Sequence, residues 1–133
     1  MKFSYFMRKE RITYRLALGY KERVKASADN ENLSISNWLA QCAIEFLDTP
    51  IAEKEALALE VADEAAEGTV MTSSMVSPPL LADIDLDVKA LGWDSRTFWL
   101  HTAMHRKMKE YRFRKTQGKL AAFKITKQQE NVT

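Results

Sequence analysis

The chain has 133 residues, of which 46% are hydrophobic and 29% are charged, with a formal net charge of +2. This length suits one ordinary domain or two very small ones that share a core, and the apolar content excludes wholesale disorder. With only four glycines and three prolines, the sequence favours helices over a turn-rich all-β design.

The single cysteine, Cys42, excludes a framework of intrachain disulfides and fits a reducing compartment. No apolar run approaches the ~18 residues that a membrane span requires. Near the N-terminus, Arg8, Lys9 and Glu10 follow too soon for a secretory apolar region. We therefore expect a cytoplasmic protein without a membrane partner.

The charge is distributed in three blocks. Residues 1–47 carry a net charge of +3, residues 48–94 carry −9, and residues 95–133 carry +8. A basic, acidic, basic layout indicates that the two ends meet a polyanion, or that the chain has three solvated faces without a partner.

The segment 11–48 predicts a strand and two helices. Residues 11–16 alternate strictly between apolar and polar side chains, with Ile12, Tyr14 and Leu16 on one face, which is typical of a half-buried strand. A helix is expected from about residue 19 to 29, and a second from the capping serines at 34 and 36 to about residue 48.

The following segments predict a connector and a second set of elements. Residues 51–66 favour an acidic helix, with a flexible linker as the alternative. Residues 70–76 look extended, Pro78-Pro79 opens a helix that Gly92 ends, and a long helix follows from Arg96 to about Lys115. The predicted organisation is an N-terminal arm, a first unit, the connector, a second unit and a basic flexible tail, at 1–10, 11–48, 49–69, 70–116 and 117–133.

A constant shift of 60 residues superposes the two units. It carries Leu16 onto Val76 and Tyr20 onto Leu80, and core or turn positions keep their character throughout. The remaining matches are Val24 with Ile84, Ala28 with Val88, Asn32 with Gly92, Trp38 with Phe98, and Ala43 with Ala103.

Over about 37 residues the first unit resembles the ribbon-helix-helix family of bacterial, plasmid and phage DNA-binding proteins. The resemblance rests on the basic alternating strand Arg-Ile-Thr-Tyr-Arg-Leu, on Tyr-Lys-Glu-Arg-Val at 20–24, and on the turn and helix start Asn-Leu-Ser-Ile-Ser-Asn-Trp-Leu at 32–39. Asn32 stands where the family often has Gly, and Asn is the next-best residue for a left-handed backbone.

The resemblance implies a mostly α fold with a short two-stranded antiparallel β-ribbon that enters the major groove of double-stranded DNA. The outer side chains Arg11, Thr13 and Arg15 would then read base edges. The start of the second helix would hold a phosphate through its backbone amides. The phosphate contacts implied are Lys9, Ser34, Ser36 and Asn37. If DNA is not the partner, the arginines are an ordinary solvated edge.

The second unit is expected to contribute less to the recognition of DNA bases, because its strand has no basic side chain. In the aligned register Met71, Ser73 and Met75 face outward, with Thr72, Ser74 and Val76 inward, and a slip of one residue would reverse every side chain. The sequence leaves this register open. Its possible DNA contacts are Ser73 and Arg96, although a carboxylate at Asp94 would repel a phosphate.

Two architectures fit a family with two units per chain. Either the units of one chain pair as a pseudo-dimer, or two chains pair through their first units as a homodimer. In the second case the last helix would add phosphate contacts, or simply be a solvated helix end. The basic residues concerned are Arg106, Lys107, Lys109, Arg112, Arg114 and Lys115.

Other chemistry has little support. His101 and His105 have metal-ligand spacing, but the third ligand is missing nearby, and Cys42 fits a small buried hydrophobe better than a nucleophile. Asp83, Asp85 and Asp87 do not converge on a helix. We expect no enzyme, cofactor or metal.

Several roles use this fold. A transcriptional repressor comes first, followed by an accessory protein of a conjugative relaxosome or of plasmid partition, and an antitoxin comes last because the tail is polar. The rival from another class is a protein-interaction adaptor that uses an acidic face.

Overall fold

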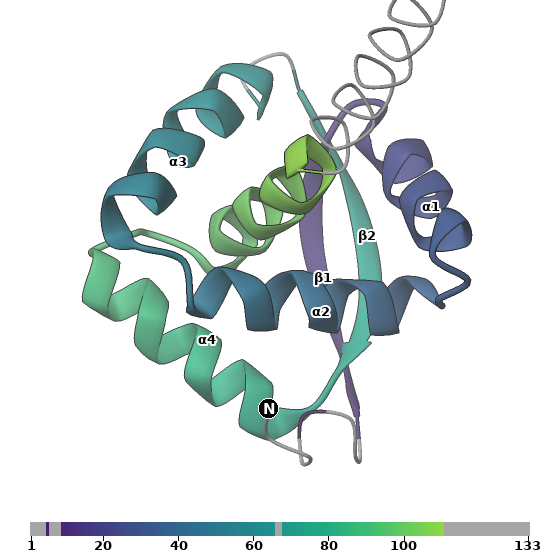
Figure 1. The fold of residues 1–133 in the computed structure, drawn as a ribbon, viewed down its shortest axis with the longest axis horizontal. Coiled ribbons are helices and arrows are strands. Elements are labelled where there is room, and N and C mark those ends of the chain that lie inside the picture. Colours follow the sequence, from purple (N-terminus) through teal and green to yellow (C-terminus); the bar gives the residue numbers. More distant parts are fainter. Residues whose placement is uncertain (1–4, 6–8, 66–67, 111–133) are drawn as a thin grey trace, which may run out of the picture.

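The computed structural model describes residue 5 and residues 9–65 and 68–110, and these form five helices and a two-stranded antiparallel sheet (Figure 1). In chain order they are β1 (Glu10–Ala17), α1 (Tyr20–Asn30), α2 (Ile35–Leu47), α3 (Ile51–Ala65), β2 (Thr69–Val76) and α4 (Pro78–Leu91), followed by a helix over residues 96–110. The expected mostly helical class is confirmed. Of the tail predicted at 117–133, no part lies within the described residues.

The sheet is a ribbon made by β1 and β2 of the same chain. Its register pairs Arg11 with Met75, Thr13 with Ser73, and Arg15 with Met71. One face of the ribbon is covered, since in Figure 1 α2 crosses in front of both strands and the 96–110 helix lies in front of β1.

The alternation of β1 sets its two faces. Ile12, Tyr14 and Leu16 are at most 7% exposed and join the core, while the residues between them are exposed. In β2 the aligned register holds, with Ser74 and Val76 buried and Met71, Ser73 and Met75 exposed. The register that the sequence left open is therefore the one with the methionines outside.

A buried hydrogen bond explains why serine is tolerated inside. The hydroxyls of Tyr14 and Ser74 lie 2.7 Å apart on the covered face of the ribbon. Burial raises the pKa of Tyr14, and the bond to Ser74 acts in the opposite direction. Because each hydroxyl gives the other a partner, neither is stranded in the core.

The core lies between the ribbon and the helices. Its largest fully buried side chains include Trp38 of α2, Trp99 of the 96–110 helix, Tyr20 and Phe46. The rings of Phe46 and Trp99 meet edge to face with centroids 5.0 Å apart, an arrangement that aromatic pairs favour.

The predicted acidic connector is helical, as α3. Its Leu57, Ala58 and Val61 are buried, at 5%, 8% and 0% exposure, so packing supports this helix. Lys54 is also buried, at 3%, and its ammonium donates to Asp87 of α4 at 2.9 Å and to the carbonyl of Leu47 at 3.3 Å. The connector is thus tied to α4.

Hydrogen bonds at the two interhelical turns recur 60 residues apart. Leu33 N donates to the carbonyl of Ala28, and Trp93 N donates to that of Val88. Asn32 and Gly92 occupy the same place in the two turns, with φ of 56° and 72° in the left-handed region. Asn32 therefore supplies the left-handed residue that ends the first helix of its unit, as Gly92 does in the second.

The shift does not stay constant beyond the turns. Ser34 caps α2 through Asn37 N, whereas the corresponding cap of the 96–110 helix is Ser95, through Phe98 N, a shift of 61. The extra residue is Asp94. Trp38 consequently matches Trp99, both at most 1% exposed. The predicted matches of Trp38 with the half-buried Phe98 and of Ala43 with Ala103 are therefore wrong.

Candidate nucleic-acid interface

The uncovered face of the ribbon carries the predicted base-reading residues. Arg11, Thr13 and Arg15 are all exposed and point away from the core, because their neighbours Ile12 and Tyr14 point into it. The guanidinium of Arg15 reaches across the ribbon to within 3.5 Å of Thr69 Oγ1. The two arginines thus flank Thr13 on an open surface.

The start of α2 brings together the four predicted phosphate contacts. Ser34 Oγ accepts from Asn37 N at 3.1 Å and so caps the helix. Lys9 Nζ donates to Asn37 Oδ1 at 2.6 Å, which places an ammonium group at this helix N-terminus. A cation beside the N-terminal amides of a helix favours an anion there.

Ser36 has a structural task that the sequence did not indicate. Its Oγ accepts a hydrogen bond from Met75 N of β2 at 3.0 Å. The start of α2 is therefore tied directly to the ribbon, so the predicted phosphate site and the predicted reading face keep a fixed relation to each other.

A groove of about 480 Å³ lies between the two strands of the ribbon, α1 and the start of α2. Lys21 of α1 lines it together with Ser36 and Thr72. Lys21 is exposed and belongs to the motif on which the family resemblance rests, but no pattern around it marked it as a candidate site residue. It adds a second cation beside the start of α2.

The start of the 96–110 helix, which corresponds to the start of α2 in the second unit, offers no such unpaired cation among its described contacts: its arginine is bound to a carboxylate. Arg96, a predicted second-unit contact, donates through Nε and Nη2 to the two carboxylate oxygens of Asp85 at 2.8 and 2.7 Å. The carboxylate of Asp85 raises the pKa of Arg96. Because its guanidinium already has a bidentate carboxylate partner, Arg96 is a poorer phosphate ligand than Lys9.

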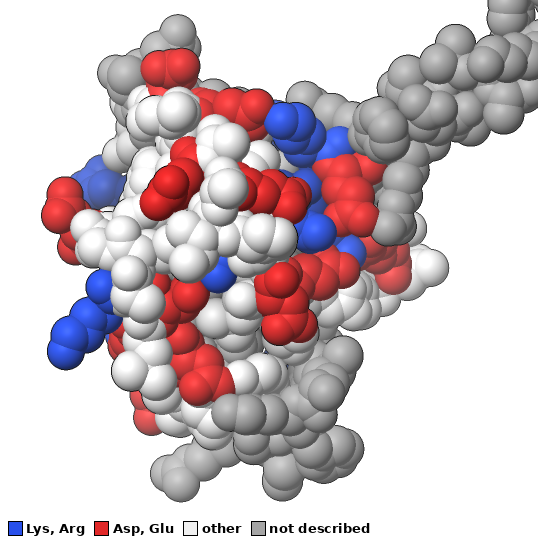
Figure 2. Space-filling view, turned by 60° about the vertical axis from the view of Figure 1, so that its left-hand side comes forward, with Lys and Arg blue, Asp and Glu red and all other residues white. Residues whose placement is uncertain are grey.

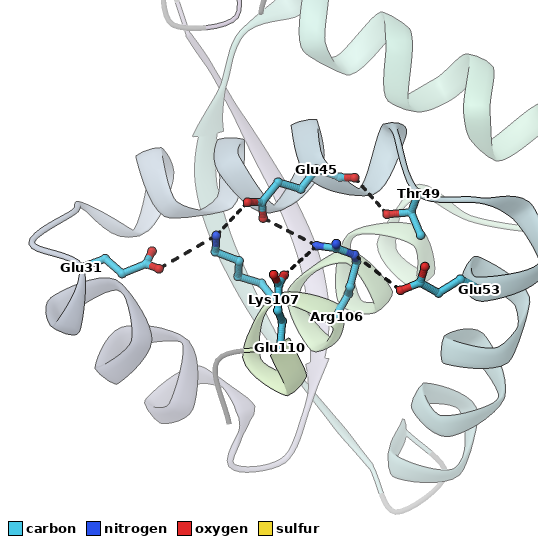
Figure 3. A network of polar contacts seen from close by, with 7 residues as sticks. All are labelled: Glu31, Glu45, Thr49, Glu53, Arg106, Lys107 and Glu110. Carbon is cyan, nitrogen blue, oxygen red and sulfur yellow. Dashed lines mark hydrogen bonds and ion pairs between the residues drawn. The ribbon is translucent and has the colours of Figure 1, made fainter. Parts of the chain in front are cut away.

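The basic run on the 96–110 helix faces carboxylates of the same chain (Figure 3). Lys107 Nζ lies 2.9 Å from Glu45 Oε1, and Arg106 lies 3.2 Å from Glu110 and 3.7 Å from Glu45. The ammonium of Lys109 lies 2.8 Å from Glu60. For the three described members of the run, these carboxylate partners count against the predicted phosphate contacts, and Arg106 and Lys107 are not simply solvated. Arg112, Arg114 and Lys115 lie outside the described residues.

The acidic connector therefore neutralises part of the basic helix. Glu53 and Glu60 of α3 lie within ion-pair distance of Arg106 and Lys109. Carboxylates, several of them in ion pairs, spread across the face formed by α3 and α4, which comes forward in Figure 2. The exposed acidic residues of these two helices include Glu53, Glu55, Glu60, Asp63 and Asp85.

The two histidines of the 96–110 helix pack in the core. His105 lies 3.0 Å from the hydroxyl of Tyr20 through Nδ1 and 2.7 Å from Glu60 through Nε2. His101 stacks edge to face on Tyr20, with ring centroids 4.3 Å apart. Burial, with smaller effects of His105 and Arg23, lowers the pKa of His101 to about 4. Their four-residue spacing thus places both rings against Tyr20.

Cys42 is 1% exposed, and burial raises the pKa of its thiol. A thiol that is buried and protonated is a weak nucleophile, in keeping with its predicted packing role.

Comparisons with models of known protein families, with characterised proteins and with solved structures gave no match. Among the described residues, every helix is too short or too polar to cross a membrane.

Proposed function

We propose that this chain binds double-stranded DNA sequence-specifically, as a ribbon-helix-helix pseudo-dimer built from its own two units. The observation that carries the proposal is the intrachain ribbon, whose uncovered face presents Arg11, Thr13 and Arg15 while the opposite face is buried. A two-stranded ribbon fits the major groove, and arginine can contact guanine in a bidentate manner.

The register supports a two-unit pseudo-dimer. Thr13 pairs with Ser73, and these residues are 60 positions apart, the same shift that relates the turns at Asn32 and Gly92. In a symmetric antiparallel ribbon the central residue of each strand pairs with its own equivalent. An approximate twofold axis through the Thr13–Ser73 pair accounts for both facts.

The surroundings of the ribbon supply the phosphate contacts of the proposal. Lys9 and Lys21 flank the start of α2, and the groove beside β2 gives a DNA backbone room next to Ser36. Backbone contacts of this kind fix the register of a protein on DNA, and base contacts then specify the sequence. A repressor or an accessory protein of a relaxosome or plasmid system would use such a site.

The test is enrichment of duplexes from a random pool by the full chain, followed by titration at two salt concentrations. We expect an enriched duplex to bind at least tenfold more tightly than its scrambled version. Arg11→Ala or Arg15→Ala should remove most of this preference, by about 1–3 kcal/mol for each lost bidentate pair. Lys89→Ala, which removes an equal charge from an exposed site on α4, is the matched control.

One observation favours a different function. The acidic face of α3 and α4 suits a basic protein partner, and an adaptor of this kind would need no ribbon arginines. If no duplex is enriched, or if all duplexes bind equally and release at higher salt, the DNA-reading proposal fails and the adaptor takes its place.

A further inference from the structure

The uncovered face of the ribbon differs chemically between its two strands. β1 contributes Arg11 and Arg15, whereas β2 contributes Met71 and Met75. Each arginine is paired across the ribbon with a methionine, Arg11 with Met75 and Arg15 with Met71. One long side of the ribbon is therefore cationic and the other is apolar.

This difference breaks the approximate twofold symmetry on the face of the ribbon that is proposed to contact the DNA bases. A shift of 60 residues relates Arg11 to Met71 and Arg15 to Met75, while Thr13 is related to the similar Ser73. A ribbon made from two identical chains repeats the same side chains on both strands, and its DNA site is correspondingly palindromic. Here the related positions carry side chains that prefer different base pairs.

The side chains of the two methionines are exposed to solvent and do not belong to the core. Met71 is 57% exposed and Met75 is 37% exposed, and the backbone of Met75 is held by Ser36 Oγ at 3.0 Å. The base feature in the major groove that matches an apolar side chain is the C5 methyl group of thymine. An unbranched thioether side chain adapts readily to such a methyl group.

We infer that one copy of this chain reads a non-palindromic DNA site, with Arg11 and Arg15 on guanines and Met71 and Met75 on thymine methyl groups. This inference rests on the DNA-binding function proposed above. It adds two specificity-determining residues, Met71 and Met75, and it fixes the stoichiometry at one chain per site.

The first measurement is the symmetry of the sequences that the full chain enriches from a random duplex pool, together with the number of chains per duplex by native mass spectrometry. We expect a motif without twofold symmetry and one chain on each duplex.

The second measurement replaces each thymine of the enriched duplex, one at a time, by deoxyuridine, which lacks only the methyl group. At contacted thymines the affinity should fall about fourfold, the value of one buried methyl group. The same replacement should have no effect at the thymine read by Met71 in the Met71→Ala variant, nor at that read by Met75 in Met75→Ala. Leu86→Ala, which removes another exposed apolar side chain, from α4, should keep the full effect.

The outcomes separate this inference from the function on which it rests. A palindromic motif, or two chains on each duplex, overturns the inference and leaves sequence-specific DNA binding in place. A deoxyuridine effect that is absent, or that persists unchanged in both methionine variants, overturns the assignment of Met71 and Met75. If no sequence is enriched, both the function and the inference fail.

Discussion

The hydroxyl groups of Tyr14 and Ser74 lie 2.7 Å apart beneath the ribbon, in a pair of residues that are 60 positions apart in the chain. The bond joins β1 to β2 on their buried face, so it contributes to the register of the whole ribbon. The same register sets which side chains reach the opposite, uncovered face.

Removing this bond should destabilise the protein. Tyr14→Phe and Ser74→Ala should each lower the free energy of unfolding in urea by about 1 kcal/mol, because the remaining hydroxyl is left buried without its partner. The double variant should lose less than the two single losses combined, since one interaction accounts for both. Ser73→Ala, on the exposed face, is the control and should change stability little. Additive losses would show that the bond does not couple the strands.

The stability of the protein should depend strongly on Asp87, the carboxylate partner of the buried Lys54. Asp87→Ala leaves a buried ammonium group and removes the acceptor of the Trp99 indole N–H, so we expect a loss of about 3 kcal/mol in the free energy of unfolding. The double variant Lys54→Met/Asp87→Leu should be more stable than Asp87→Ala. Asp85→Ala breaks an exposed pair with Arg96 and should cost under about 1 kcal/mol. Equal losses at both aspartates would contradict this reading of the contact.

Stability should decrease with acidity because of His101. Its folded pKa is about 4, whereas the unfolded chain binds a proton at this residue near pH 6.5. Between these two values the unfolded state holds more protons, so the free energy of unfolding decreases as the pH falls from about 6.5 to 4. His101→Gln cannot be protonated, and urea titrations at several pH values should give it a shallower dependence over this window. Parallel curves for the two proteins would exclude His101 as the cause.

The salt dependence of the proposed DNA binding should distinguish Lys9, whose ammonium binds the uncharged amide of Asn37, from Lys107, whose ammonium has a carboxylate partner. Lys9→Gln should reduce the slope of log Kd against log salt by about 1, because one phosphate contact is lost. Lys107→Gln should leave the slope unchanged, since the ammonium of Lys107 lies 2.9 Å from Glu45. The measurement is titration of one enriched duplex at four or more salt concentrations. A reduced slope for Lys107→Gln alone would place DNA on the 96–110 helix.

Much of the local structure could be predicted because short-range patterns determine it. The alternation around Tyr14 predicts the two faces of β1, and Asn32 predicts a left-handed turn. Both depend on residues next to one another in the chain. The element boundaries also follow closely, since β1 begins and ends within one residue of the predicted strand.

What could not be predicted depends on partners from distant segments. The register of β2 was undecided because both of its faces carry small polar or apolar side chains, and Tyr14 supplies the partner that makes a buried Ser74 acceptable. The basic run around Lys107 looked available because its carboxylate partners come from the end of α1, at Glu31, and from α2 and α3. The turn before the 96–110 helix holds one extra residue, Asp94, which a constant shift cannot reveal.

The ribbon joins two segments of one polypeptide, and this changes how the protein responds to dilution. A ribbon shared by two chains comes apart when the protein becomes scarce, because its formation is bimolecular. Here the segment between Leu18 and Gly68 connects the strands, so their pairing is a first-order process with a fixed effective concentration. The midpoint of thermal unfolding is therefore expected to be the same at nanomolar and micromolar protein, and a few copies in a cell suffice to keep the ribbon assembled.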